Sequence, residues 1–333
     1  MSTEQLSTPT SRWSEAGARA ADSWWLRYFG SRLAQGLLVV LGAITVSFFL
    51  INASGDFTDA LQINANVKAD DIERLRHEFG YDRPLLVRYV DNVADISHGD
   101  FGTQYGSGTP ARTLVLRALP NTAVLVLAAI VIAWPAALLV SLFSVLRRGT
   151  RGDWVVRQTV MVTQGVPEFW AALLLVLLFS VNLQWFPSIG FNDGVRSLVL
   201  PALALAIPLI PLLVRLTRGQ LLDFMALDLA TALRARGITD LRIVFRHGLP
   251  NVMVPTIHFL SLQLGWLLGG TLIVETVFAW PGMGQLLLTS VQQHELSVAQ
   301  AVIVVLAIAF VVLNLLADVL SFAIDPRIRR AER

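Results

Sequence analysis

Residues 228–250 read DLATALRARGITDLRIVFRHGLP, a polar, arginine-rich stretch that lies between two long apolar segments. Within it no helix breaker precedes Gly237, and the residues before that glycine have the spacing of a helix. We expect Gly237 to end that helix, because glycine adopts the left-handed geometry of a C-cap without steric cost. A second short helix is predicted over residues 239–247, with Thr239 or Asp240 as its N-cap. The stretch is therefore expected to form a helix–glycine–helix elbow.

Six apolar segments flank this elbow, and each is about as long as a membrane span. An α-helix rises 1.5 Å per residue, so about 20 residues cross about 30 Å of hydrocarbon. The chain of 333 residues is 54% hydrophobic and only 15% charged, whereas soluble domains are about 25% charged. The sequence therefore predicts an all-α polytopic membrane protein with six transmembrane helices in one helical domain. The predicted spans cover residues 33–51, 121–146, 154–183, 198–216, 252–277 and 298–322.

Arginine residues gather in the segments that would lie on one side of the membrane. Cytoplasmic loops carry an excess of Lys and Arg. With a cytoplasmic N-terminus, the elbow and the arginine-rich turn 147–151 lie inside, whereas the short outer loops 182–197 and 278–297 hold a single Arg. The outer loop 52–118 is long enough to be translocated whatever its charge. We therefore expect both termini in the cytoplasm, with residues 1–23, which lack a signal-peptide core, as a mobile cytoplasmic tail.

The long outer loop is predicted to contain short amphipathic helices. Apolar residues recur with helical spacing over 72–79 and again over 86–93, on either side of a turn at 80–84. Two interpretations stay open. The helices either cap the transmembrane bundle or form a docking surface for a partner on the outer face.

The sequence carries no motif that would make the chain a catalyst on its own. It has no G-x-x-x-x-G-K-[ST] loop, so we do not expect it to bind and hydrolyse ATP. The five histidines lack metal-ligand spacing, there are no cysteines, and no G-x-S-x-G elbow occurs. The arginines lie mostly beside apolar segments, which is typical of membrane topology and not of nucleic-acid binding. We therefore expect a non-catalytic membrane protein with no metal site, no cofactor of its own and no nucleic-acid partner.

Few ionisable side chains lie at membrane depth, where such groups often mark functional sites. Glu168 lies near the middle of the third span, Glu275 near the outer end of the fifth, and Asp318 in the last turns of the sixth. Asn314 and Asp318 are four residues apart and so share a helix face. Hydrogen bonding between helices explains these residues better than a proton relay, which needs a chain of such groups.

Several motifs together resemble one family. The segment 228–237 (DLATALRARG), followed by Leu249-Pro250, looks like the coupling loop of bacterial ATP-binding-cassette (ABC) importer permeases, in particular of the dipeptide/oligopeptide/nickel branch. Thr231 stands where the general pattern has a glutamate, which argues against a salt bridge to the ATPase at that position. The resemblance covers about residues 26–330, through the strings 82–85 (DRPL), 99–102 (GDFG), 268–270 (LGG), 274–284 (VETVFAWPGMG) and 325–329 (DPRIR).

The resemblance implies a type I ABC importer permease fold and a set of partners. These would be a second homologous permease subunit, two cytoplasmic ATPase subunits or domains that bind ATP and Mg²⁺, and an extracytoplasmic substrate-binding protein. The chain would form half of the translocation pathway across the inner (cytoplasmic) membrane of a bacterium. The branch favours di- and oligopeptides as cargo, with nickel, glutathione or another small solute as the alternative. An ATP-independent secondary carrier is the competing class.

The resemblance also assigns candidate functional residues. Within a permease domain at 24–333, a coupling loop at 217–250 would sit in a groove of one ATPase, and a gate loop at 277–297 would close the outer mouth. The alternatives are a surface hairpin for the first and a merely structural turn for the second. The candidate coupling residues are Asp228, Ala232, Arg234, Arg236, Gly237, Leu249 and Pro250, and the candidate gate residues are Glu275, Trp280, Pro281, Gly282 and Gly284.

Overall fold

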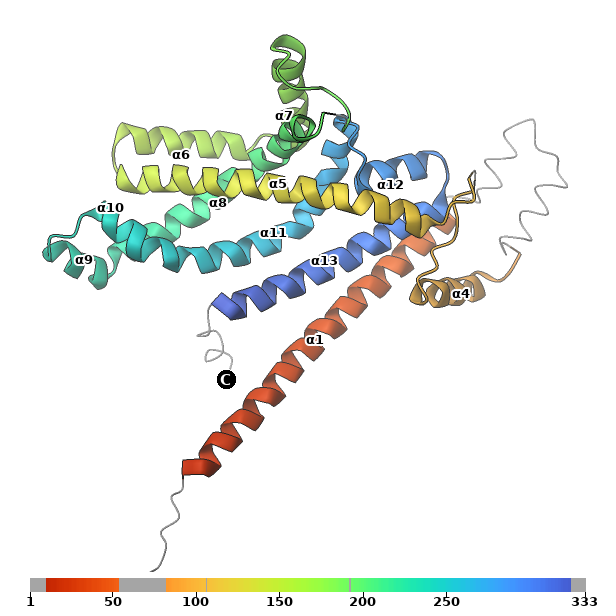
Figure 1. The fold of residues 1–333 in the computed structure, drawn as a ribbon, viewed down its shortest axis with the longest axis horizontal. Helices are drawn as coiled ribbons and strands as arrows, with labels where there is room; N and C mark the ends of the chain where they lie inside the picture. Colours follow the sequence, from red (N-terminus) through yellow and green to blue (C-terminus); the bar gives the residue numbers. More distant parts are fainter. Residues whose placement is uncertain (1–9, 54–81, 106, 192, 325–333) are drawn as a thin grey trace, which may run out of the picture.

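The computed structural model describes residues 10–53, 82–105, 107–191 and 193–324, with the backbone alone for residues 10–29 and 320–324. These residues are mostly helical, and among them the only β-type pairing is an isolated bridge between Thr103 and Pro110. Five long helices pack along one another as a bundle (Figure 1). They are α1 (Thr10–Ala53), α5 (Ala111–Leu146), α8 (Val195–Ala226), α11 (Leu249–Val277) and α13 (Leu296–Ile324).

The spans agree with the six apolar segments of the sequence. Within the described residues, five helices are long and apolar enough to cross a membrane. A sixth span results if α6 (Arg151–Gln164) and the following helix are counted together as one broken span. The prediction of an all-α polytopic membrane protein is confirmed. The five continuous spans are Gly30–Ala53, Ala111–Leu146, Val195–Ala226, Asp240–Val277 and Leu296–Val319.

The third predicted span is sharply bent. Helix α6 and the helix pair formed by α7 (Glu168–Leu175) and the π-helical segment Val176–Asn182 meet at 103°. Pro167 is the N-cap of α7, with ψ 143°. A proline also disfavours helical geometry in the residue before it, so the helix ends ahead of it. Helix α7 consequently turns away from the bundle instead of continuing along it (Figure 1).

Helix α8 forms the centre of the bundle. Of its apolar span, 67% is buried inside the chain, against 22–33% for the other four. It packs along α5, where Ala129, Ala133 and Ala137 are fully buried at four-residue spacing. Small residues at this spacing let two membrane helices approach closely. The α5–α8 pair is therefore the core against which α6, α7 and α11 pack.

The two ends of the bundle carry different short helices. Helices α9 (Asp228–Ala235) and α10 (Asp240–Ile243) lie at one end, together with the turn between α5 and α6 (Figure 1). Helices α4 (Leu85–Ser97) and α12 (Met283–Gln292) lie at the other end (Figure 1). This separation matches the division into inner and outer loops that the arginine pattern predicted.

Helix α4 packs against the bundle as a cap. The Tyr89 hydroxyl and the Thr45 hydroxyl of α1 are hydrogen-bonded at 2.8 Å. The amides of Asn92 and of Gln300 in α13 exchange two hydrogen bonds, at 2.8 and 3.1 Å. A helix over 86–93 is thus confirmed, and its contacts favour the capping interpretation. The other predicted helix, over 72–79, lies outside the described residues.

Several helix boundaries differ from the predicted spans, among them the end of α8, which lies at Ala226 rather than at residue 216. Helix α1 begins at Thr10, so residues 10–23 of the predicted tail are helical and continuous with the first span. Residues 1–9 lie outside the described part of the chain. Helix α5 begins at Ala111 rather than at residue 121 and includes Pro120. The first turns of α5 contain polar and charged residues, which lower the local hydropathy. The helix therefore begins before the apolar segment does.

Candidate functional site

The predicted elbow is present, and Gly237 stands at its turn. Helix α9 ends at Ala235, and Gly237 adopts φ +79°. The Gly237 N–H donates to the Arg234 carbonyl at 2.9 Å. The Ile238 N–H donates to the Leu233 carbonyl at 3.1 Å. These two bonds form a Schellman motif, in which a left-handed residue closes the last helical turn. The prediction that Gly237 ends the helix is confirmed.

The chain bends once more at Leu227, where the sequence contains no helix breaker. Leu227 has extended geometry, with ψ 151°, and separates α8 from α9. The bend brings Ala230 into a buried apolar cluster with Phe224 and Ile243. Residues 224 and 230 are six apart and would not share a face of one straight helix. The helix that ends before Gly237 is therefore separate from α8, and this separation buries the cluster.

Arg234 links three parts of the elbow. Its Nε donates to Asp240 Oδ1 of α10 at 2.8 Å. Both of its terminal nitrogens lie 3.3 Å from the carbonyl oxygen of Met225, in the last turn of α8. Carbonyls in a last helical turn lack intrahelical donors. Arg234 thus holds α9 against α8 and α10, while its predicted contact with an ATPase stays a prediction.

The surface of the elbow combines polar and apolar side chains. Besides Arg234, three of the predicted coupling residues are exposed on α9 or at its C-cap. The structure adds three large apolar residues that are each about half exposed, which the sequence analysis did not select. Exposed apolar side chains interspersed with exposed polar ones are typical of a protein contact surface. The predicted residues are Asp228, Ala232 and Arg236, and the added ones are Leu229, Leu241 and Phe245.

The second helix of the elbow does not end before the membrane span. Helix α10 continues through a π-helical segment, Val244–Gly248, into α11, so that Asp240–Val277 forms 38 continuous helical residues. Leu249 and Pro250 therefore lie in the first turn of α11 rather than in a loop. Thr239 is the N-cap, as one of two candidates predicted, but its side chain makes no cap hydrogen bond. The predicted stop at residue 247 is wrong, because α10 continues as helix into α11.

Glu275, at the opposite end of α11, is fully buried and accepts three hydrogen bonds. Its Oε1 accepts from the Thr122 hydroxyl of α5 at 2.7 Å. Its Oε2 accepts from the backbone N–H groups of Gly284 at 2.6 Å and Gln285 at 3.1 Å. Both N–H groups belong to the first turn of α12, which lacks intrahelical acceptors and favours negative charge. We call Glu275, Thr122 and the first turn of α12 the α12 clamp.

Helix α5 also holds the turn that precedes α12. The Trp280 indole Nε1 donates to the Asn121 carbonyl at 3.1 Å, and the Asn121 amide donates to the Pro281 carbonyl at 2.7 Å. The Met283 N–H donates to the Thr122 hydroxyl at 2.8 Å. The sequence analysis missed Asn121 and Thr122. No local pattern could have found them, because 160 residues separate Asn121 from Pro281.

Two glycines of the predicted gate are required for space. A Cβ on Gly282 would collide with the Glu275 carboxylate. A Cβ on Gly284 would lie 2.5 Å from the Leu272 Cα, a backbone atom that cannot move aside alone. The structure therefore brings the five predicted gate residues together around one buried carboxylate. Their role as a gate stays a prediction.

A second buried network, which the sequence analysis missed, lies near the elbow. Asp153 of α6 accepts hydrogen bonds from Arg218 Nη2 of α8 at 3.0 Å and from the Gly149 N–H at 3.2 Å. The Ser144 hydroxyl of α5 donates to Asp153 and accepts from Arg218 Nε at 2.7 Å. The network joins α5, α6 and α8. Its two charged members are 65 residues apart in the chain, so only the fold reveals the pair.

Removing the positive charge of this network should destabilise the inner end of the bundle. We expect Arg218→Gln to lower the free energy of unfolding by about 3 kcal/mol, because the buried Asp153 carboxylate loses its close ionic partner and keeps only the more distant, half-exposed Arg157 at 3.7 Å. Thermal unfolding of the purified assembly in detergent measures the effect. Arg215→Gln is the matched control, since Arg215 is exposed on the same helix and its loss should cost less than about 0.5 kcal/mol. Equal destabilisation by both variants would contradict the role of the network.

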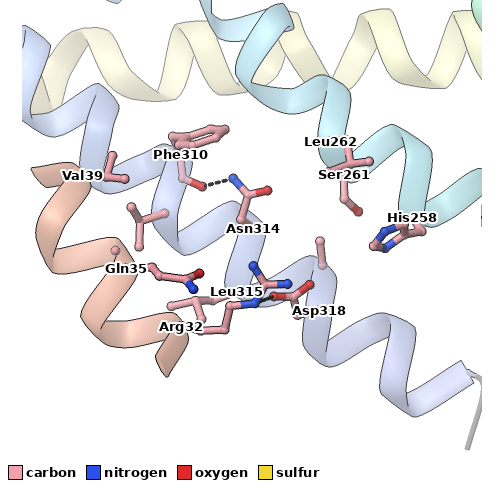
Figure 2. Close-up of a pocket in the computed structure, with 13 residues that line it drawn as sticks. Arg32, Gln35, Val39, His258, Ser261, Leu262, Phe310, Asn314, Leu315 and Asp318 are labelled. Carbon is pink, nitrogen blue, oxygen red and sulfur yellow. Dashed lines mark hydrogen bonds and ion pairs between the residues drawn. The ribbon is translucent and has the colours of Figure 1, made fainter. Parts of the chain in front are cut away.

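A cavity of about 280 Å³ lies between α1, α11 and α13 (Figure 2). In its wall, Arg32 Nε of α1 and Asp318 Oδ2 of α13 form an ion pair at 3.1 Å. Asn314, one turn earlier on α13, donates instead to the Phe310 carbonyl of its own helix at 2.8 Å. The expected bonding between helices is thus confirmed for Asp318 and not for Asn314. The ion pair attaches α1 to α13 at the edge of the bundle.

These features can be compared with known proteins. Residues 135–330 match the family described as the binding-protein-dependent transport system inner membrane component. The chain belongs to this family. The match covers α6 to α13, and so includes both the elbow and the α12 segment of the clamp. Family membership implies that this permease is a multi-pass component of an inner membrane and works with an ATPase and a binding protein.

Similarity to individual permeases extends over most of the chain. The oligopeptide transport system permease protein AppB of Bacillus subtilis is 33% identical over 311 residues, which cover 90% of this chain and 98% of AppB. The glutathione transport system permease protein GsiC of Salmonella typhimurium is 34% identical over 301 residues, which cover 89% of this chain and 96% of GsiC. The similarity therefore includes segments that precede residue 135.

The architecture also matches a solved transporter. The inward-facing MetNI methionine ABC transporter matches with a TM-score of 0.53 at 21% identity, over 64% of this chain and 96% of that chain. At this identity the similarity concerns the fold. This permease therefore has the type I ABC importer permease fold that the motifs implied, and α1 and α4 lie outside the residues that match the family model.

Proposed function

We propose that this permease is the transmembrane subunit of an ATP-driven importer of di- and oligopeptides and forms half of its translocation pathway. The observation that carries the proposal is the elbow. It exposes a mixed polar and apolar surface on α9 and joins the 38-residue helix that contains α11. A partner that moves α9 would therefore also move α11. The names of the relatives AppB and GsiC support a peptide as the cargo.

In this proposal the two ends of the bundle have different roles. The elbow would lie in the cytoplasm and enter a groove of one ATPase, with Asp228, Ala232 and Arg236 in contact and Arg234 as the residue that positions α9. Both termini would be cytoplasmic. The α12 clamp would lie at the outer mouth, where α12 would follow the motion of α11 through Glu275. The complete importer would contain a second homologous permease, two ATPase subunits or domains and an extracytoplasmic binding protein.

Reconstitution tests the proposed function. We expect proteoliposomes with this permease, its partner permease, the ATPases and the peptide-loaded binding protein to transport trialanine only when ATP is present on the ATPase side. Glutathione and Ni²⁺ are the comparison cargoes, because nickel and glutathione are the alternatives for this branch. Transport of trialanine without ATP would contradict an ATP-driven importer. Transport of Ni²⁺ and not of peptides would contradict the proposed cargo.

A further inference from the structure

The bend between α6 and α7 forms one wall of a groove that neither the elbow nor the α12 clamp uses. The groove has a volume of about 660 Å³ and lies between this bend, the middle of α8 and the face of α11. Three polar side chains line it: Gln164 before the bend, Glu168 after it, and Gln263 on α11. The indole of Trp266, one turn after Gln263, is 41% exposed and also lines it.

Glu168 differs from three other acidic residues on the membrane helices, because those three have hydrogen-bond or ion-pair partners and Glu168 has none within the described part of the chain. Glu275 accepts three hydrogen bonds, and Asp153 and Asp318 each pair with an arginine. Glu168 makes no hydrogen bond or ion pair with any residue that the structure describes, although it is only partly exposed. A carboxylate at membrane depth without compensation is unfavourable. Its natural complement is a cationic group that enters the groove.

Gly270 allows the carboxylate to lie against α11. A Cβ at residue 270 would lie 2.6 Å from Glu168 Oε2, so any side chain there would displace the carboxylate. A Cβ at the neighbouring Gly269 would have no atom within 4 Å. The absence of a side chain at residue 270 thus leaves the space against α11 that the Glu168 carboxylate occupies.

We infer that Glu168 binds the ammonium group of a peptide as it passes along this groove. The inference rests on the proposed function, since it names the chemical group of the cargo that this chain contacts. A carboxylate binds an ammonium group through a charge-assisted hydrogen bond, and an indole face attracts a cation. The amides of Gln164 and Gln263 can each donate and accept, as a peptide backbone requires. The competing occupant is a cationic side chain of the second permease.

Four variants of the reconstituted importer test this inference. We expect Glu168→Gln, which keeps the shape and removes the charge, to lower ATP-dependent uptake of trialanine at least tenfold, because a charged hydrogen bond is lost. Glu168→Asp should retain more uptake than Glu168→Gln. Gly270→Ala should lower uptake because it displaces the flexible carboxylate. Gly42→Ala is the same change on the membrane helix α1, away from the groove and with open space for the added Cβ, and should act as the wild type.

Photo-crosslinking distinguishes a direct contact from a structural effect. A tripeptide with a free N-terminus and a photoreactive second residue should label residues 164–168 or 263–273 of the working wild-type importer. Labelling should be lost in Glu168→Gln and Gly270→Ala and retained in Gly42→Ala. Wild-type labelling outside these segments, or unchanged uptake by Glu168→Gln, would overturn the inference. Loss of the second permease on purification of Glu168→Gln would also overturn it and assign the groove to a subunit contact. An importer that transports no trialanine would instead refute the proposed function itself.

Discussion

Gly237→Pro is expected to reduce peptide-stimulated ATP hydrolysis by the reconstituted importer to its unstimulated rate, while the chain still inserts into the membrane. Proline holds φ near −65° and has no N–H. Gly237 has φ +79°, and its N–H donates to the Arg234 carbonyl. The substitution therefore breaks the Schellman motif at the turn between α9 and α10. Because α9 would no longer have a fixed orientation relative to α10, a movement of α9 by the ATPase would not be transmitted to α11.

Gly237→Ala is the matched control for this experiment. Alanine keeps the N–H, and a Cβ at residue 237 would have no atom within 4 Å. Its cost is the left-handed backbone strain, about 1–2 kcal/mol. We expect this variant to retain most of the stimulation, with the rate of ATP hydrolysis measured against the concentration of peptide-loaded binding protein. Normal stimulation in Gly237→Pro would contradict the role of the elbow in transmission.

The sequence predicted the features that depend on neighbouring residues. The turn at Gly237 was predictable because left-handed geometry is a local property of glycine. The spans were predictable because membrane helices need about 20 apolar residues in a row. The break in the third span lies at Pro167, a local signal as well, since a proline interrupts hydrogen bonding within a helix. The angle of that break was not visible, because the packing of α7 against α8 and α11 determines it.

Features that join distant segments escaped the sequence analysis. The bend at Leu227 has no local signal, because it serves the cluster of Ala230 with Phe224 and Ile243. In the sequence, Asp153 and Arg218 look like ordinary charged residues beside apolar segments. Only the packing of α6 on α8 makes them a buried pair. The gate motif was visible as a string of residues. Its partners on α5 were not, since two neighbouring polar residues beside a span have many possible roles.

The roles of individual polar residues at membrane depth could not be predicted either, because they depend on contacts with distant segments. Glu168 and Glu275 were both isolated acids in apolar segments, and only the family resemblance singled out Glu275, as a candidate gate residue. The structure separates them, because Glu275 meets three donors and Glu168 meets none among the described residues. One is therefore part of the fold, whereas the other is left available to a ligand.

Glu275→Ala is expected to destabilise the α12 clamp severely and to stop transport. The substitution leaves the Thr122 hydroxyl and the N–H groups of Gly284 and Gln285 without an acceptor in a buried site. Each unsatisfied buried donor costs about 1–3 kcal/mol. We therefore expect a loss of at least about 3 kcal/mol in the free energy of unfolding, measured by thermal unfolding of the purified assembly. Glu275→Gln should lose less, because its single carbonyl oxygen can still accept from α12.

A double-mutant cycle locates the effect in the clamp. Thr122→Val removes the hydroxyl that donates to Glu275 and accepts from the Met283 N–H. Its effect and that of Glu275→Ala should not add, because both residues belong to one hydrogen-bonded network. Thr276→Val is the matched control, since Thr276 is exposed beside Glu275 and bonds only to the Leu272 carbonyl of its own helix among the contacts described. Additive effects at Thr122 and Glu275, or an equal loss in Thr276→Val, would show that the clamp does not act as a unit. Non-additive losses of unfolding free energy, together with a fall in transport, would indicate that α12 moves with α11, because the Glu275 carboxylate of α11 is hydrogen-bonded to α12.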